Sequence, residues 1–449
     1  MSDEIKLTKL EYLKENSRQL RGALADELAN DEDHLSGDTA QILKFHGSYQ
    51  QRDRDRRSGP QGRAYMFMIR TAIPGGRLTA QQLLAELDLC DRYGNGTLRI
   101  TTRQDLQLHG IVKKNLRETI RTINQAQLTT FCGCGDVERN VMCCPAPYRA
   151  SPVRAGMQEM AARFAKHLRP RTRAYYEIWL QDDNGSRQDV TDFRPVEEPI
   201  YGDRYLPRKF KTGFALPEDN CVDVLTYDLG FVAVVEDDRI VGYNVAIGGG
   251  QGVTPAVKTT FPALAQTIAF VSPDQVLPLG EAVVKVFRDF GNRADRKRAR
   301  LKYVIADRGL QWVKNKVEEY FGAPLAEPRP QSIFDAQDHL GWHEQGDGRL
   351  FLGINVENGR IHDTDQVRLK TVLRTLLQRY DFPVRLTPLQ SLILCDINPT
   401  DRATVEQLLT DHGVVPAERL TQTRRYAMAC PALPTCGLAI TESERVMPH

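Results

Sequence analysis

The sequence predicts a mixed α/β (α+β) protein with an internal pseudo-twofold repeat. Apolar strand-like runs alternate with helix-like segments through short turns, which is typical of α/β and α+β folds. Two segments from the first third of the chain recur near its end at one offset of 286 residues. Because related sequences fold into related structures, we expect two similar halves and a site where they meet.

The predicted elements of the first half follow one another closely. Ala64–Arg70 is a short apolar run ended by Pro74-Gly75-Gly76, which predicts a buried strand and a turn. Leu78–Cys90 has helical spacing, and Thr79 at its start is a candidate N-cap. Leu98–Thr101 then alternates as a strand does. Strand, helix and strand therefore make up this half.

The repeat is the most informative internal feature. Leu98–Leu108 matches Val384–Leu394 at five of eleven positions, and Glu138–Pro147 matches Arg424–Leu433 at five of ten. Two matches at one offset are hard to attribute to chance. The second half should therefore repeat the fold of the first.

The segment between the repeats, residues 150–330, has its own signals. Ala174–Leu180 and Phe231–Val235 predict strands, whereas Glu281–Phe290 and Leu310–Tyr320 predict helices. This segment should form a further α/β unit between the two halves.

Composition excludes several classes of protein. A hydrophobic fraction of 41% with 26% charged residues excludes wholesale disorder. Sixty basic against 58 acidic residues give a net charge of +2, so any basic site is local. Residues 1–57 are strongly charged, and we interpret them as a mostly helical arm. Nine cysteines, an acidic N-terminus and a longest uncharged stretch rich in glycine favour a cytosolic protein.

Basic side chains gather at three places. Arg99, Thr101, Arg103 and Gln107 share one face if the strand continues, and buried arginines need anionic partners, either a ligand or neighbouring carboxylates. Lys209 and Lys211 lie on one side of an extended segment, where a solvated strand edge is the simpler alternative. On a helix, Arg293, Lys297 and Arg300 would share a face, which is more often only solvated. His109 alone is more often structural.

The cysteines are clustered. Cys430 and Cys436 are separated by five residues, two of them prolines, which suits an iron–sulfur cluster better than a zinc knuckle. Cys132, Cys134, Cys143 and Cys144 form a second group, and Cys144 is the repeat counterpart of Cys430. For an isolated cysteine such as Cys221, a small buried hydrophobe is the simpler interpretation.

Several motifs together resemble one known family. FHGSYQQRDRDRR, RITTRQDLQLHGI, GDVERNV, RTRAYYEIWL, YLPRKFKT, GNRADRKRARLKY and CPALPTCGLAITESER occur in that order from Phe45 almost to the end of the chain. They are similar to the haemoproteins of the assimilatory sulfite reductase family, which includes sirohaem nitrite reductases. The resemblance implies ferredoxin-like half-domains, a sirohaem, a four-iron four-sulfur cluster, and six-electron reduction of sulfite to sulfide in sulfur assimilation.

The resemblance also implies roles for individual residues. The sulfite cage would be formed by Arg70, Arg139, Lys209 and Lys211. Sirohaem carries eight carboxylates, and its contacts would be Arg99, Thr101, Arg103, Gln107, His109 and Arg300. The cluster would be bound by Cys430 and Cys436.

The resemblance divides the chain into five segments. These are the arm 1–57, a first half-domain 58–149, a sirohaem- and substrate-binding unit 150–330, a second half-domain 331–400, and 401–449 as the start of an iron–sulfur-binding domain.

Several functional alternatives stay open. Related nitrite reductases carry Asn where this chain has Lys211, so the pair Lys209 and Lys211 favours sulfite over nitrite. No segment resembles a flavin or nicotinamide module, so electrons are expected from a flavoprotein or ferredoxin. The family continues beyond the equivalent of His449 with two further cluster ligands, so we expect a fragment whose cluster site is incomplete and whose activity alone is low. The other alternative is a non-catalytic paralogue that binds sirohaem or nucleic acid.

Overall fold

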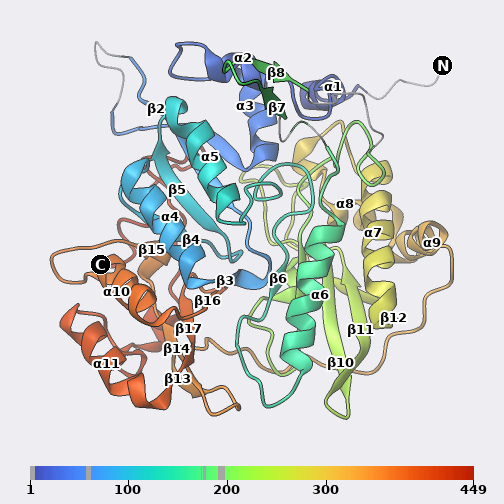
Figure 1. The fold of residues 1–449 in the computed structure, drawn as a ribbon. Helices are drawn as coiled ribbons and strands as arrows, with labels where there is room; N and C mark the ends of the chain where they lie inside the picture. Colours follow the sequence, from blue (N-terminus) through green and yellow to red (C-terminus); the bar gives the residue numbers. More distant parts are fainter. Residues whose placement is uncertain (1–5, 57–61, 173, 175–177, 191–197) are drawn as a thin grey trace, which may run out of the picture.

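The computed structural model describes residues 6–56, 62–172, 174, 178–190 and 198–449. Three five-stranded sheets make up most of the fold (Figure 1). One sheet belongs to each half of the repeat, and the third belongs to the unit between them. A two-stranded ribbon of β7 (Trp179–Gln181) and β8 (Arg187–Asp189) lies beside the N-terminal helices.

The sheet of the first half is antiparallel and is built around a hairpin. Its order is β1 (Ser48–Arg52), β2 (Tyr65–Thr71), β5 (Leu106–Ile111), β4 (Leu98–Ile100) and β15 (Arg360–Ile361). Two helices of the same half contact each other, α4 (Ala80–Arg92) and α5 (Leu116–Gln125). The Thr79 side chain and Gln82 form a capping box at the start of α4, which confirms the predicted helix and its N-cap.

The second half repeats this arrangement. Its sheet runs β13 (Gly341–Glu344), β14 (Leu350–Ile354), β17 (Leu392–Ile397), β16 (Val384–Leu386) and β3 (Arg77–Leu78). Its helices are α10 (Leu369–Tyr380) and α11 (Arg402–Asp411). The aligned sequence segments become equivalent hairpins, β4–β5 and β16–β17, so the predicted pseudo-twofold repeat is confirmed.

The two halves exchange short edge strands. β15 follows β14 in the second half but pairs with β4, so that Arg360 lies opposite Arg99. Reciprocally, β3 comes from the first half and pairs with β16, so that Arg385 lies opposite Arg77. Each sheet is therefore completed by the other half, and neither half forms its full sheet alone.

The central unit holds the third sheet and the longest helices. Its strand order is β12 (Gln266–Val271), β11 (Arg239–Ile247), β10 (Leu229–Glu236), β9 (Thr212–Ala215) and β6 (Met142–Cys143). β9 runs parallel to both β10 and β6. The helices are α6 (Val153–His167), α7 (Val276–Phe290), α8 (Leu301–Arg308) and α9 (Leu310–Phe321). β10 confirms the strand predicted in this segment, and α7 and α9 confirm its two predicted helices. Ala174–Leu180 lies partly outside the described residues, and β7 covers its end.

The N-terminal arm lies across the top of the molecule in Figure 1 and is less helical than predicted, because its helices cover fewer than half of its described residues. Its helices are α1 (Lys9–Glu15), α2 (Leu24–Ala29) and α3 (Gly37–Leu43). The arm ends in β1, an edge strand of the first sheet, because Ser48–Arg52 pairs in register with Tyr65–Ile69. Its Lys14 is fully buried and donates to Glu11 at 2.6 Å and to the Leu206 carbonyl at 2.8 Å.

One predicted continuous strand is wrong, the one carrying Arg99, Thr101, Arg103 and Gln107. β4 ends at Ile100, and the Thr101 hydroxyl accepts the backbone N–H of Arg103 at 3.1 Å. Gln104 then has φ 57°, which reverses the chain into β5. As a result Gln107 lies opposite Arg99 on the neighbouring strand.

The helix on which Arg293, Lys297 and Arg300 would share a face does not form. α7 ends at Phe290, and the Asn292 side chain accepts the backbone N–H of residues 294 and 295. Such a local bond competes with helix hydrogen bonding. Arg296–Arg298 form a single 3₁₀ turn, and α8 begins only at Leu301.

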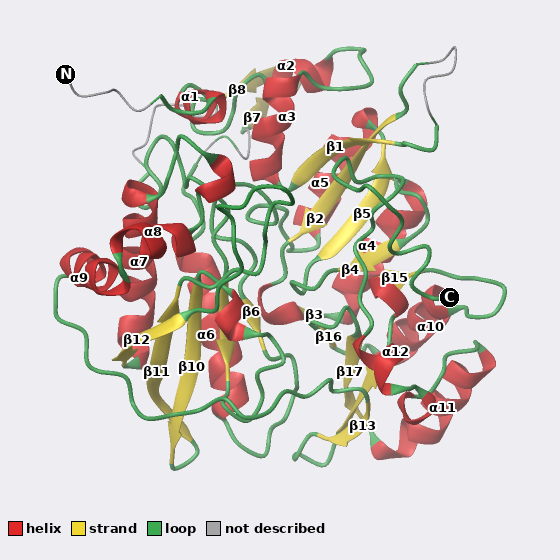
Figure 2. Ribbon diagram, turned by 180° about the vertical axis from the view of Figure 1, so that it is seen from behind, coloured by secondary structure: helices red, strands yellow, loops and turns green. Residues whose placement is uncertain are grey.

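The C-terminal part lies over the second half, and both views place the chain end near α10 (Figures 1 and 2). After the short α12 (Gln422–Tyr426) the chain forms turns without regular structure. Arg360 pairs with Glu444 in a forked geometry at 2.6 and 2.8 Å. Among the described residues, we find no helix both long and apolar enough to span a bilayer.

The close approach of the halves can be tested at Gly359. A Cβ there would lie 2.2 Å from the Ile100 carbonyl oxygen, and φ is +73°. Gly348 has a similar φ of +81°, but nothing lies within 4 Å of its Cβ position. Gly359→Ala should therefore cost about 3 kcal/mol or more, against about 1 kcal/mol for Gly348→Ala. Denaturant titration of both variants measures this, and equal losses would contradict a tight junction.

Candidate functional site

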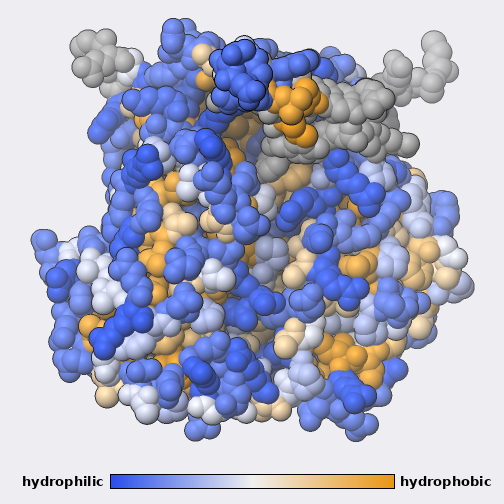
Figure 3. Space-filling view, viewed as in Figure 1, coloured by the Kyte–Doolittle hydropathy of each residue, from blue (hydrophilic) through white to orange (hydrophobic). Residues whose placement is uncertain are grey.

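A strongly basic cavity of about 460 Å³ lies between the central sheet and the loops beside it. The segment before β9, the glycine-rich loop after β11, and the turn leading to α8 form its walls. Among the described residues that line it, none is acidic and seven are basic: Arg208, Lys209, Lys211, Arg296, Lys297, Arg300 and Lys302. The face of the molecule shown in Figure 3 is mainly hydrophilic, and its hydrophobic side chains form separate patches. Such a lining favours a polyanionic ligand.

Lys209 and Lys211 flank a buried phenylalanine. Phe210 is fully buried, and its backbone pairs with residues 137–139, since its N–H donates to the Val137 carbonyl and its own carbonyl accepts from Arg139. Because alternate residues of an extended segment point to opposite sides, both lysines line the cavity, as predicted.

Burial and neighbouring cations depress the pKa of both lysines. Burial, followed by the charges of Arg139 and Arg208, lowers the pKa of Lys209 to about 7. Burial, then Arg103 and Arg300, holds the pKa of Lys211 well below its ordinary value. Among the described residues, neither ammonium group has a carboxylate within salt-bridge distance. Burial and the neighbouring cations therefore disfavour the charged form of both lysines, which an anion bound beside them would favour.

Arg70 and Arg139 meet at one backbone carbonyl. Both guanidinium groups donate to the Gly133 carbonyl, Arg70 at 3.1 Å and Arg139 Nε at 3.0 Å. The Arg70 Nε is buried without a hydrogen-bond partner, and its closest carboxylate, Asp105, lies 3.9 Å away. The charge of Arg70 also contributes to the lowered pKa of Lys209. The structure thus brings together the four predicted members of the cage.

The predicted cofactor contacts occupy different positions. Arg300 lines the cavity and is held by Asp228 through two bonds of 2.9 and 2.7 Å. Arg103 is buried, donates to the Thr212 carbonyl at 2.9 Å and stacks on the Tyr227 ring. Thr101 is buried, and its hydroxyl closes the turn after β4.

Arg99, Gln107 and His109 lie together on the hairpin, beside the C-terminal loop. Arg99 donates to Gln107 at 3.2 Å and to the Ala429 carbonyl. Burial and the nearby Arg360 lower the pKa of Arg99 to about 10, although Glu444 acts in the opposite direction. Burial, followed by Arg360 and Arg99, holds the pKa of His109 well below its ordinary range, so its imidazole is neutral near pH 7.

The cysteine loop lies next to this group. Cys430 is exposed and Cys436 is half-buried, and both are free thiols. Arg54 holds the loop by donating to the Cys436 carbonyl at 2.9 Å and to the Ala439 carbonyl at 2.6 Å. The arm, the first hairpin and the cysteine loop therefore meet at one place, with both thiols accessible.

Sequence reasoning missed the acids that organise the basic site. Asp228 fixes Arg300 and accepts the Lys211 backbone N–H at 3.0 Å. Asp136 pairs with Arg296 at 2.7 and 3.1 Å. No local sequence pattern identifies a single aspartate as the partner of a distant arginine. It also missed that Lys302 donates to the carbonyls of Gly250 and Gly252 and so fixes the glycine-rich loop.

This geometry defines a protein of paired half-domains that binds a polyanionic group beside a central α/β unit. The family model described as the nitrite and sulphite reductase 4Fe-4S domain matches residues 159–325. The nitrite/sulfite reductase ferredoxin-like half-domain matches residues 59–126 and 343–412. The chain belongs to the nitrite and sulfite reductase family.

Characterised relatives agree with this assignment. The chain is 46% identical to the sulfite reductase (NADPH) hemoprotein beta-component of Geobacillus kaustophilus over 98% of its own length and 77% of that protein. It is 43% identical to the sulfite reductase (ferredoxin) of Synechococcus elongatus, covering 99% and 73%. The solved structure of Mycobacterium tuberculosis NirA protein superposes with a TM-score of 0.78 at 25% identity, covering 98% and 76%. The likeness thus extends over nearly the whole chain.

The family implies a four-iron four-sulfur cluster and a sirohaem, and the residues present fit both groups. A polycarboxylate macrocycle needs cationic donors, and the cavity lining includes Arg208, Lys297 and Arg300. A four-iron cluster needs four thiolate ligands, and the free thiols of Cys430 and Cys436 would supply two of them.

The lowered pKa of Lys209 predicts a pH-dependent stability. The folded pKa of about 7 lies below the ordinary 10.5, so the unfolded chain binds more protons between these values and stability rises with pH there. Lys209→Met in cofactor-free protein should raise the free energy of unfolding by about 2 kcal/mol at pH 6, and the gain should diminish as the pH rises above about 7 and vanish above about pH 11. Urea titrations across this range test it, with the exposed Lys258→Met as control. A gain independent of pH would contradict an uncompensated charge.

Proposed function

We propose that this chain is the catalytic haemoprotein of an assimilatory sulfite reductase that converts sulfite to sulfide. The observation that carries the proposal is the cluster of Arg70, Arg139, Lys209 and Lys211, four cations with too few carboxylates to neutralise them. Burying uncompensated charge is costly, so such a cluster is retained where an anion binds. Sulfite is an anion of suitable size and charge.

In this proposal, different residues hold the anion and protonate it. Arg70 and Arg139 converge on the Gly133 carbonyl, which fixes their planar guanidinium groups for forked contacts to sulfite oxygens. A lysine whose pKa is about 7 gives up a proton readily near neutral pH, so Lys209 suits general acid catalysis. Lys211 adds positive charge next to it.

The overall reaction demands many protons. Sulfite, six electrons and seven protons give hydrosulfide and three waters, so each departing oxygen must be protonated. When bound, the sirohaem and the cluster supply electrons to the sulfur atom. In this proposal Arg99, Arg103 and Arg300 would contact the cofactor carboxylates, and Cys430 with Cys436 would bind cluster iron.

Electrons come from a separate protein in this proposal. Relatives are named for NADPH and for ferredoxin, so the family uses more than one donor. The exposed Cys430 lies beside a surface that includes the exposed side chains of Leu438 and Ile440, 93% and 88% accessible. We expect the donor to approach on this side, where the distance to the cluster thiols is short.

The double variant Lys209→Met with Lys211→Met tests the cage. It should retain the sirohaem absorption spectrum and iron content of the unchanged protein but lose at least about 100-fold in kcat for sulfite, because both proton delivery and charge stabilisation disappear. The assay is sulfide production by the natively purified haemoprotein with a chemical electron donor. Lys258→Met, exposed and distant in sequence, serves as control. Unchanged turnover in the double variant would contradict the proposed role of the two lysines in proton delivery and charge stabilisation.

Lys211 should also decide between sulfite and nitrite. Lys211→Asn removes one positive charge from the cage while keeping a hydrogen-bond donor. The ratio of kcat/KM for sulfite to that for nitrite should fall at least about tenfold, since the doubly charged sulfite depends more on that charge. Steady-state turnover on both anions gives the ratio. A parallel fall on both would instead assign Lys211 a general electrostatic role, and a native preference for nitrite would overturn the sulfite assignment.

A further inference from the structure

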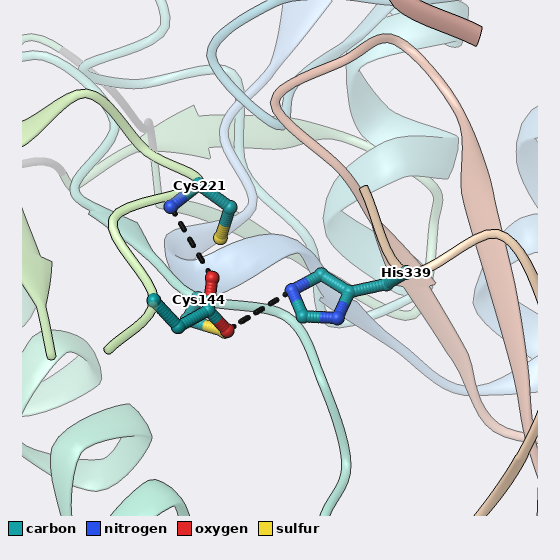
Figure 4. Close-up of side chains that lie close together, drawn as sticks. Cys144, Cys221 and His339 are labelled. Carbon is teal, nitrogen blue, oxygen red and sulfur yellow. Dashed lines mark hydrogen bonds and ion pairs between the residues drawn. The ribbon is translucent and has the colours of Figure 1, made fainter. Parts of the chain in front are cut away.

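A second cluster of metal-ligating side chains lies in the interior, outside the basic cavity. Cys144, Asp219, Cys221 and His339 each direct one ligand atom to a common point, and these four atoms lie within 4.8 Å of one another. All four residues are buried, with 0 to 7% of their surface exposed. Figure 4 shows the two cysteines and the imidazole converging from separate segments of the chain.

The distances between the ligand atoms fit a tetrahedral site. The Cys144 Sγ lies 3.6 Å from the His339 Nε2 and 3.0 Å from the Asp219 Oδ2, and these last two atoms are 3.1 Å apart. Bond lengths of about 2.0 to 2.3 Å at tetrahedral angles place zinc ligands about 3.3 to 3.8 Å apart. The three distances among Cys144, Asp219 and His339 thus lie within a few tenths of an ångström of this range, and the Cys221 Sγ, within 4.8 Å of the other three ligand atoms, would move by up to about 1 Å to complete the site.

The charges of the site also match a divalent cation. With both cysteines deprotonated by metal binding, two thiolates and one carboxylate would carry three negative charges, which is too many to bury alone. Arg154 Nη1 donates to both the Cys144 Sγ and the Asp219 Oδ2 at 2.7 Å and supplies one positive charge. A dication supplies the other two, so the buried group becomes neutral.

We propose that Cys144, Asp219, Cys221 and His339 form a structural zinc site. Two sulfur ligands, one nitrogen and one oxygen suit zinc, which is borderline in softness and prefers four ligands. Four protein ligands leave no open position, and the residues are buried, so the site is closed and its role is structural. The Cys144 that follows β6 thus has a function different from that of its repeat counterpart Cys430.

The ion would join the central unit to the second half. The Asp219–Cys221 turn is tied to the segment before β13, because Asn220 N–H donates to the Asp335 carbonyl at 2.9 Å and Gln337 N–H to the Asp219 carboxylate at 3.4 Å. His339 comes from that segment, two residues before β13 begins at Gly341. A metal at this junction would fix how the second half enters the fold.

The orientation of the imidazole supports this assignment. The Nε2 of His339 faces the cluster, whereas its Nδ1 is buried without a hydrogen-bond partner among the described residues. The polar interactions that orient this ring are therefore those of the cluster itself. The competing explanations are a metal-free ion-pair network around Arg154 and a disulfide between Cys144 and Cys221.

Metal analysis of the natively purified haemoprotein tests the site without reference to activity. Zinc by plasma mass spectrometry should be about one per chain, separate from the iron. Cys221→Ser and the nearly isosteric Asp219→Asn should each lower zinc at least about fivefold with unchanged iron, whereas Cys90→Ser, a buried cysteine in α4, should retain both. X-ray absorption at the zinc edge of the unchanged protein should show two sulfur neighbours at about 2.3 Å.

Three results would overturn the proposal. The first is zinc below about one tenth per chain in protein purified without chelator, which would leave the ion-pair network. The second is zinc that stays at about one per chain in both Cys221→Ser and Asp219→Asn. The third is a Cys144–Cys221 disulfide, detected by mass spectrometry of alkylated peptides from unreduced protein. Because none of these readouts depends on sulfite turnover, they test the zinc site independently of the proposed function.

Discussion

The arrangement depends on a reciprocal junction between the two halves. The Gln104 side chain donates to the Leu386 carbonyl at 2.9 Å, and the Gln390 side chain donates to the Ile100 carbonyl at 3.3 Å. Both pairs are related by the 286-residue repeat, and both glutamines have positive φ, 57° and 60°. Each bond ties the turn of one hairpin to the strand end of the other. An amide buried without such a partner costs about 1–3 kcal/mol, so the two halves stabilise each other.

This junction fixes the hairpin that carries the basic residues. Arg99 lies on β4 and Arg103 in the turn that follows it, one directed to the C-terminal loop and the other to the central sheet. Since the hairpin cannot shift without breaking the Gln104 bond, both cations are held in place before any anion arrives. Rigid placement lowers the reorganisation needed when charge develops in a reaction. The pseudo-twofold fold therefore serves the site by rigidity as well as by location.

The sequence predicted the repeat, most elements and the pairing of Lys209 with Lys211, because these depend on local periodicity. It failed at Arg103, where a positive φ at Gln104 turned one predicted strand into a hairpin, and at Arg293, where the Asn292 side chain stopped a helix. Contacts between residues that are distant in the sequence could not be predicted from it either. The exchanged strand β15 has only two residues, and nothing near Cys221 indicates that His339 lies beside it. Both depend on the tertiary fold.

Two groups of cations near the arm and the basic cavity differ in how their charges are neutralised. Lys14, Arg293 and Arg296 pair with Glu11 or Asp136 beneath the arm, and their charges are balanced within the fold. Lys209 and Lys211 follow the Tyr205–Pro207 segment and, among the described residues, have no carboxylate within salt-bridge distance. The balanced group fixes the segment from Tyr205 to Pro207, through bonds from Arg293 and Arg296 to its carbonyls. Salt bridges of the arm thus hold the segment that carries the two lysines in place against their mutual repulsion, and an anion bound in the cavity would neutralise them.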